Sequence, residues 1–134
     1  MLDHVLDELL LAHLKTVPAL AAINGYTGQD NADHKLPAIT VSTTSEPLAG
    51  SDTAFRGEVG VIIESEAHDT TAAAHGERVE AVRAALANRA AVITVINATA
   101  RLHIYGYAPL GTEPTAGDAR FATKLKYRFG FGLA

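Results

Sequence analysis

The stretch of sequence that decides the fold reads RFATKLKYRFGFGLA and covers residues 120–134. Its side chains alternate in character. One parity carries cations, namely Arg120, Lys124, Lys126 and Arg128. The other parity is mainly apolar, with Phe121, Thr123, Leu125, Tyr127, Phe129 and Phe131. A period of two is typical of a β-strand with one buried face, because successive side chains point to opposite sides. At ~3.3 Å per residue, residues 120–131 would span about 40 Å, roughly twice the usual strand length. We therefore predict a long strand that lies along a partner or protrudes from its own domain.

The composition is that of an ordinary globular protein. Of the 134 residues, 48% are hydrophobic and 19% are charged, which argues against disorder and fits one domain over residues 1–134. The chain has no cysteine, which excludes disulfides, thiol catalysis and thiolate zinc sites and fits a reducing compartment. Acidic residues at positions 3, 7 and 8 stand where a signal peptide would carry Lys or Arg. No run approaches the ~20 apolar residues of a membrane span. We expect neither export nor membrane insertion.

The net charge of −4 is unevenly spread along the chain. Residues 1–55 contain only two cationic side chains, Lys15 and Lys35, against the acids Asp3, Asp7, Glu8, Asp30, Asp33, Glu46 and Asp52. Residues 119–134 contain cations and no acid. Such asymmetry can orient a nucleic acid or a complementary subunit. Alternatively, the cationic strand face pairs with an acidic neighbour in its own sheet.

The first half of the chain predicts one helix and two strands. Apolar residues at three- and four-residue spacing predict an amphipathic helix from residue 2 that Pro18 ends. Residues 19–35 are interpreted as a polar connection with a turn at Asn24 and Gly25. Residues 36–44 are β-branched and alternating, and a loop of small and turn-forming residues follows at 45–53. Residues 55–66 predict a second long strand, with an apolar parity and an acidic one.

The second half predicts one or two helices and two strands. A helix is expected from Asp69, as N-cap, to Ala87, with His75, Val79, Val82 and Leu86 packed on the apolar faces of the long strands. Residues 89–98 suit a buried strand or a helix, and we favour a short helix. Residues 101–108 alternate, and residues 109–119 predict a loop rich in Gly and Pro. The order predicts an α+β fold with a four-stranded, mostly antiparallel sheet and helices packed on one face.

No pattern of catalytic or metal-binding residues stands out. Even on one continuous helix, His68 and His75 would lie about 10.5 Å apart along the axis, whereas a shared zinc needs bonds of ~2 Å. Ser51 comes nearest to a nucleophile, but it lacks the Gly-x-Ser-x-Gly elbow. There is no Gly-rich phosphate loop. Tyr127 and Phe129 lie on the parity opposite to the cations, which disfavours a nucleic-acid stacking platform. We therefore predict no enzyme activity, no metal and no cofactor.

The order of elements resembles that of the tail terminator and tail completion proteins of long-tailed bacteriophages. The features that carry the resemblance are the N-terminal helix, the strand LPAITV at residues 36–41, and the strand at 55–66 followed by the helix at 69–87. The closing strand at 120–131, separated by a loop from RLHIY at 101–105, completes them.

This resemblance implies a structural virion protein that forms a hexameric ring. Such a ring caps the tail tube and joins the tail to the head or neck connector, and double-stranded DNA passes through it without sequence recognition. The implied partners are other copies of the chain, the tail tube protein and the connector. The implied location is the virion, and the host cytoplasm during assembly.

The charged parities of the two long strands supply the candidate contact residues. These candidates are Arg56, Glu58, Glu64, Glu66, Arg120, Lys124, Lys126 and Arg128. We expect Glu58, Glu64 and Glu66 to meet Lys124, Lys126 and Arg128, across the sheet or across a subunit boundary. The loops at 45–53 and 109–119 are expected to order on contact with ring neighbours or the tube. Three alternatives stay open: a small α+β ligand-binding or enzymatic domain, a head-closure adaptor of the same virion region, and a non-specific nucleic-acid binder.

Overall fold

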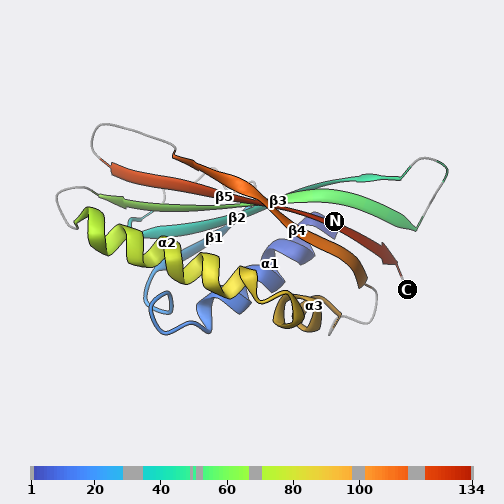
Figure 1. Ribbon diagram of the computed structural model, residues 1–134, viewed down its shortest axis with the longest axis horizontal. Helices are drawn as coiled ribbons and strands as arrows, with labels where there is room; N and C mark the ends of the chain where they lie inside the picture. The colour runs from blue at the N-terminus through green and yellow to red at the C-terminus, as the bar shows by residue number, and fades with distance from the viewer. Residues whose placement is uncertain are drawn as a thin grey trace.

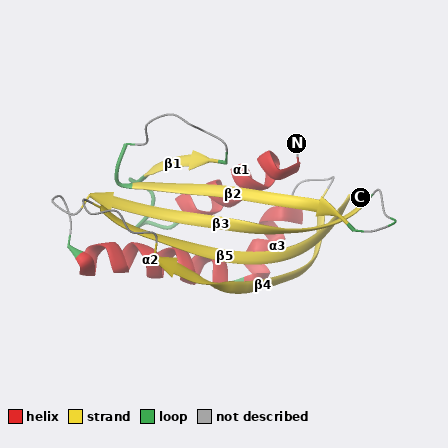
Figure 2. Cartoon of the chain, turned by 90° about the horizontal axis from the view of Figure 1, so that it is seen from above, coloured by secondary structure: helices red, strands yellow, loops and turns green. Residues whose placement is uncertain are grey.

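The computed structural model describes residues 2–28, 35–48, 50, 53–66, 71–97, 102–114 and 120–133. In chain order, its elements are α1 (Leu2–Lys15), β1 (Asn24–Thr27), β2 (Ala38–Pro47), β3 (Ala54–Glu66), α2 (Ala72–Ala87), α3 (Arg89–Asn97), β4 (Leu102–Pro114) and β5 (Arg120–Leu133). The strands form one layer, and the helices lie together beneath it (Figure 1). Figure 2 looks onto the other face of the sheet, with the helices behind it. The predicted α+β class, with helices on one face, is confirmed.

The sheet has five strands in the order β1-β2-β3-β5-β4, not the predicted four. All pairs are antiparallel except β1 with β2, which makes the sheet mixed. The missed strand is β1, because residues 24 and 25 were interpreted as a turn. Its four residues are too few to show a period of hydrophobic side chains. The strand is stabilised instead by contacts with β2 and α1. The Asn24 amide nitrogen donates to the carbonyl of Pro37, and Leu11 of α1 lies so close to Gly25 that a Cβ there would be 3.0 Å from it.

Two strands run further than predicted. Strand β2 continues to Pro47, because residues 45–47 pair with Phe55–Gly57 across the hairpin. Strand β4 continues to Pro114 along the edge of the sheet, with register shifts between Ile104 and Gly106 and between Pro109 and Gly111. Bulges at an edge are where a strand tolerates Pro and Gly. Within the first predicted loop, Leu48, Gly50 and Thr53 lie outside the strands, as expected. Residues 49, 51–52 and 115–119 lie outside the described residues.

The helical predictions for the second half hold, with one correction. Helix α2 begins after Thr71, whose hydroxyl accepts a hydrogen bond from the Ala74 amide at 3.1 Å. Thr71 is therefore the N-cap in place of Asp69, which lies outside the described residues. Asn88 ends α2 as predicted, and its side chain also caps α3 by accepting from the Ala91 amide at 3.2 Å. The favoured helix for residues 89–98 is confirmed as α3.

One core fills the space between the helices and the sheet. The predicted stripe of α2 is buried: His75, Val79, Val82 and Leu86. It packs with the apolar parities of β3 and β5, among them Val59, Val61, Ile63, Leu125, Tyr127 and Phe129. Leu6, Leu10 and Leu14 of α1 belong to the same core. Because the apolar parities face the helices, the charged parities of β3 and β5 lie on the helix-free face.

Candidate functional site

The predicted charged residues of the two long strands lie side by side on the helix-free face. In the register of β3 and β5, Glu58 is opposite Arg128 and Glu66 is opposite Arg120, while Glu64 is opposite Ala122. Of the predicted meeting of Glu58, Glu64 and Glu66 with Lys124, Lys126 and Arg128, the register therefore bears out only the pair of Glu58 with Arg128, within one sheet. Opposed charges on neighbouring strands contribute about 0.2–1 kcal/mol per pair, and Glu58 and Arg128 are exposed, which favours the lower end. A role of these residues at a subunit boundary stays a prediction.

The two lysines of β5 lie beside glycines on this face. Lys126 is opposite Gly60 on β3 and Gly111 on β4. Lys124 is opposite Ile62, and its side chain extends over Gly60, where an added Cβ would be 2.7 Å from Lys124 Cε. The hydrocarbon stem of Lys124 thus lies against the sheet, as long cationic side chains do when they cover a surface. The missing Cβ at residue 60 is what makes room for it.

Arg56 lies at the hairpin end of β3 and pairs with β2. Its Nε donates to Glu46 Oε1 at 2.8 Å, with both side chains more than 60% exposed. An ion pair so open to water contributes little to stability. Glu46 or Arg56 can therefore leave this ion pair for another partner at a small cost in free energy.

A groove of about 710 Å³ lies at this same end of the sheet. Its described lining comes only from β2, β3, β4, β5 and Leu48, which directly follows β2. Phe55, Tyr107 and Phe129 line it together with Leu48, and it also includes the charged residues Glu46, Arg56, Glu58 and Arg128. Figure 1 shows the β2–β3 hairpin diverging from the end of β5 here. Aromatic side chains together with Arg are enriched at protein–protein contacts.

Sequence reasoning missed this groove because strand parity assigns Phe55 to the core. The ring of Phe55 does stack on that of Phe131, with centroids 5.3 Å apart and planes 12° apart. Phe55 is nevertheless only half-buried, since the groove opens beside it. The alternation of a strand predicts which face of the sheet a side chain lies on. It does not predict which part of that face the helices leave uncovered.

A buried polar chain joins α2 to the sheet. His75 contacts Ser65 Oγ through Nδ1 and Thr123 Oγ1 through Nε2, both at 3.1 Å, and Arg78 donates to Ser65 Oγ at 2.8 Å. Burial, and secondly the charge of Arg78, lowers the pKa of His75, so the ring is neutral at pH 7. Both ring nitrogens of His75 thus have partners, as a buried imidazole requires. A Ser–His contact can serve nucleophilic catalysis, but Ser65 is only 1% exposed, so no substrate reaches it.

A carboxyl group is buried where α1 meets β2. Asp7 is 3% exposed, and in the described part of the chain its Oδ1 has no hydrogen-bond partner, although Thr43 of β2 lies near enough to oppose part of the effect of burial on its pKa. Burial raises the pKa of Asp7 from 3.8 to about 6, with the charge of Asp3 adding to the rise. Asp3 itself accepts a hydrogen bond from Ser45 of β2. Asp3 thus ties α1 to β2, whereas burial of the Asp7 carboxylate opposes the packing of α1 on β2.

Comparison with models of known protein families and with curated proteins finds no match to this chain. In the described ranges, His, Asp and Glu side chains do not gather in threes as a metal site requires. None of the described helices is both long and apolar enough to cross a membrane. The predicted resemblance to tail terminators therefore rests on the order and spacing of the elements in the sequence, and it stays a prediction.

Proposed function

We propose that this protein is a structural subunit that works by assembly, as a ring of identical copies that caps a bacteriophage tail tube and joins the tail to the head or neck connector. The groove of about 710 Å³ at the hairpin end of the sheet carries the proposal. Its aromatic, aliphatic and charged side chains have the composition of a protein contact. Side chains from four strands line it, so a partner seated there would contact most of the sheet at once.

The rest of the molecule supports a role in assembly. The helix-free face of the sheet carries opposed charges that leave it polar and open to water or to a partner (Figure 2). Catalysis is disfavoured because the one Ser–His pair of the described chain is buried and serves packing. A head-closure adaptor from the same virion region would use the same surface, and it differs from a terminator only in binding the connector without binding tubes.

The decisive measurement is the mass of the particle in solution, by light scattering, with and without purified tail tubes. Six subunits of 14.1 kDa would give a particle of about 85 kDa. A protein that stays monomeric even with tubes present contradicts the ring. A stable dimer supports a ligand-binding or enzymatic domain instead.

A variant that fills the groove with a large side chain tests whether the groove is needed for ring formation and tube binding. Thr44 is exposed and lines the groove, so Thr44→Trp should block a partner without disturbing the core. Ala84→Trp is the matched control, because Ala84 is exposed on α2 and lies outside the groove lining. We expect Thr44→Trp to lose rings and tube binding and Ala84→Trp to keep both. Equal behaviour of the two variants excludes the groove.

A further inference from the structure

A second cleft, of about 390 Å³, lies on the helix side of the sheet between the C-terminal half of α2 and the edge strand β4. Leu86, Leu125, Tyr107 and Tyr127 give it an apolar lining. The two tyrosine rings stack with centroids 5.6 Å apart and planes 6° apart, and Tyr107 donates to the carbonyl of Leu86 at 2.7 Å. The floor is therefore preformed. Its volume is in the roughly 300–1,000 Å³ range of sites that hold small ligands, which is room for a few side chains.

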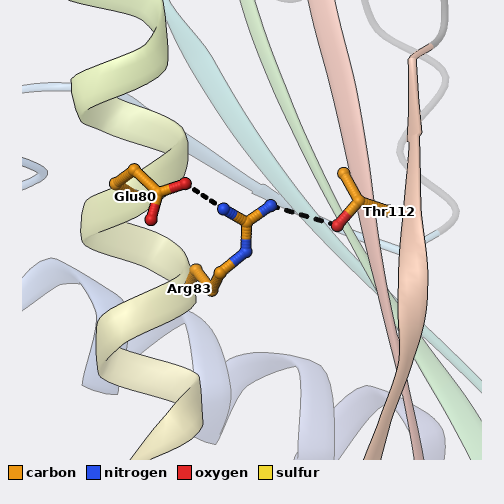
Figure 3. A network of polar contacts seen from close by, with 3 residues as sticks. All are labelled: Glu80, Arg83 and Thr112. Carbon is orange, nitrogen blue, oxygen red and sulfur yellow. Dashed lines mark hydrogen bonds and ion pairs between the residues drawn. The ribbon is translucent and has the colours of Figure 1, made fainter.

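Two arginines flank this cleft. Arg83 reaches from α2 toward β4, donating to Glu80 and, through Nη2, to Thr112 Oγ1 at 3.1 Å (Figure 3). Arg89, at the start of α3, is exposed and has no partner among the described groups. Leu110 of β4, 42% exposed, extends the apolar surface along the strand edge. An apolar floor between guanidinium groups favours a segment that offers an apolar side chain next to a carboxylate.

The chain itself carries such a segment at the end of the β2–β3 hairpin. Glu46 and Pro47 are exposed and Leu48 is half-buried. The hairpin projects beyond the helices at the right of Figure 1. In the sheet order, β5 lies between this hairpin and β4, so a chain cannot place its own hairpin end in its own cleft. A hairpin end that enters this cleft must therefore come from another copy.

We propose that the hairpin end Glu46–Pro47–Leu48 of one subunit docks in the α2–β4 cleft of the next, with Pro47 and Leu48 on the tyrosine floor and the Glu46 carboxylate between Arg83 and Arg89. The inference rests on the proposed ring and names its subunit contact. The contact is heterologous, since two different patches meet, and such contacts close into rings when the rotation permits. Glu46 gives up only its exposed pair with Arg56, which is a small loss.

A charge exchange tests the ionic half of the contact. Glu46→Lys and Arg89→Glu each place like charges together, so each single variant should lose most of the ring by light scattering. The double variant restores an opposite pair at every contact and should recover it. Glu8→Lys is the matched control, because Glu8 is an exposed acid on α1 outside both surfaces, and it should assemble normally. Failure of the double variant to recover assembly while both singles lose it contradicts the pairing.

A capping experiment tests the apolar half and the heterologous geometry. Leu48→Asp disables the hairpin end, and Ala87→Trp fills the cleft that Ala87 lines; the Ala84→Trp variant again serves as control. Each variant alone should be monomeric, with circular dichroism and thermal midpoint close to those of the wild type. Mixed in equal amounts, they should form a 1:1 dimer and nothing larger, because only one hairpin end and one cleft remain competent.

The outcomes distinguish a failure of this subunit contact from a failure of the proposed ring. Rings that persist in both single variants overturn the contact and leave the ring standing. A mixture that stays monomeric, although the wild type forms rings, overturns it as well. If Leu48→Asp unfolds, Glu46→Lys replaces it in the mixture, since Glu46 is exposed. A wild type that is monomeric with tubes present overturns both proposals.

Discussion

Replacing Asp7 by Asn should stabilise the protein at neutral pH and change its pH dependence. The carboxyl group is 97% buried against β2, and its pKa rises from 3.8 to about 6 because burial disfavours the charged form. A native pKa above the unfolded one means that the folded chain binds more protons between those values. The free energy of unfolding therefore falls as the pH rises from about 4 to about 6. At 1.36 kcal/mol per pKa unit, the full loss is about 3 kcal/mol.

The assay is urea unfolding of wild type and Asp7→Asn from pH 4 to pH 8, at a subunit concentration below assembly. Asn has the same shape and no charge, so the variant should lack this loss of stability, matching the wild type near pH 4 and exceeding it by up to about 3 kcal/mol at pH 7. Glu8→Gln, an exposed acid of the same helix, should leave the wild-type profile in place. An Asp7→Asn protein with the wild-type pH profile, or one less stable at pH 7, would refute the reasoning.

Three further predictions concern the sheet face, the core and the helix cap. Replacing Lys124, Lys126 and Arg128 together by Glu should impair ring formation in light scattering while circular dichroism stays native. Two of the three are directly opposite an acid in the register, Arg128 opposite Glu58 and Lys124 opposite Glu113, and each lost pair costs about 1 kcal/mol or less. Normal rings would exclude this face from assembly. Leu86→Ala should lower the free energy of unfolding by about 2–5 kcal/mol, since Leu86 is 1% exposed in the core, and a loss under 1 kcal/mol in urea unfolding would mean that the helix does not pack as described. Thr71→Ala should cost about 1 kcal/mol through the lost cap to Ala74, with Thr71→Asp, which keeps an acceptor, near wild type; equal loss in both would contradict the cap.

Periodicity alone was sufficient for the elements that face one another across the core. The alternation in residues 120–131 and 55–66 and the stripe from His75 to Leu86 each predicted a buried side, and the structure joins those sides in one core. The same parities predicted the opposed charges of Glu58 and Arg128. Such patterns can be predicted because burial of an apolar side chain is favourable whichever apolar surface covers it.

Only the tertiary structure decided the features that depend on one particular neighbour. Strand β1 exists because the Pro37 carbonyl and Leu11 lie beside it, and residues 109–114 are strand because β5 offers a ladder that bulges can follow. The burial of Asp7 beneath β2, the groove beside Phe55 and the cleft beneath β4 likewise arise where separate segments meet. Such contacts cannot be predicted from local sequence, because their interaction energy depends on pairs of residues that are far apart in the chain.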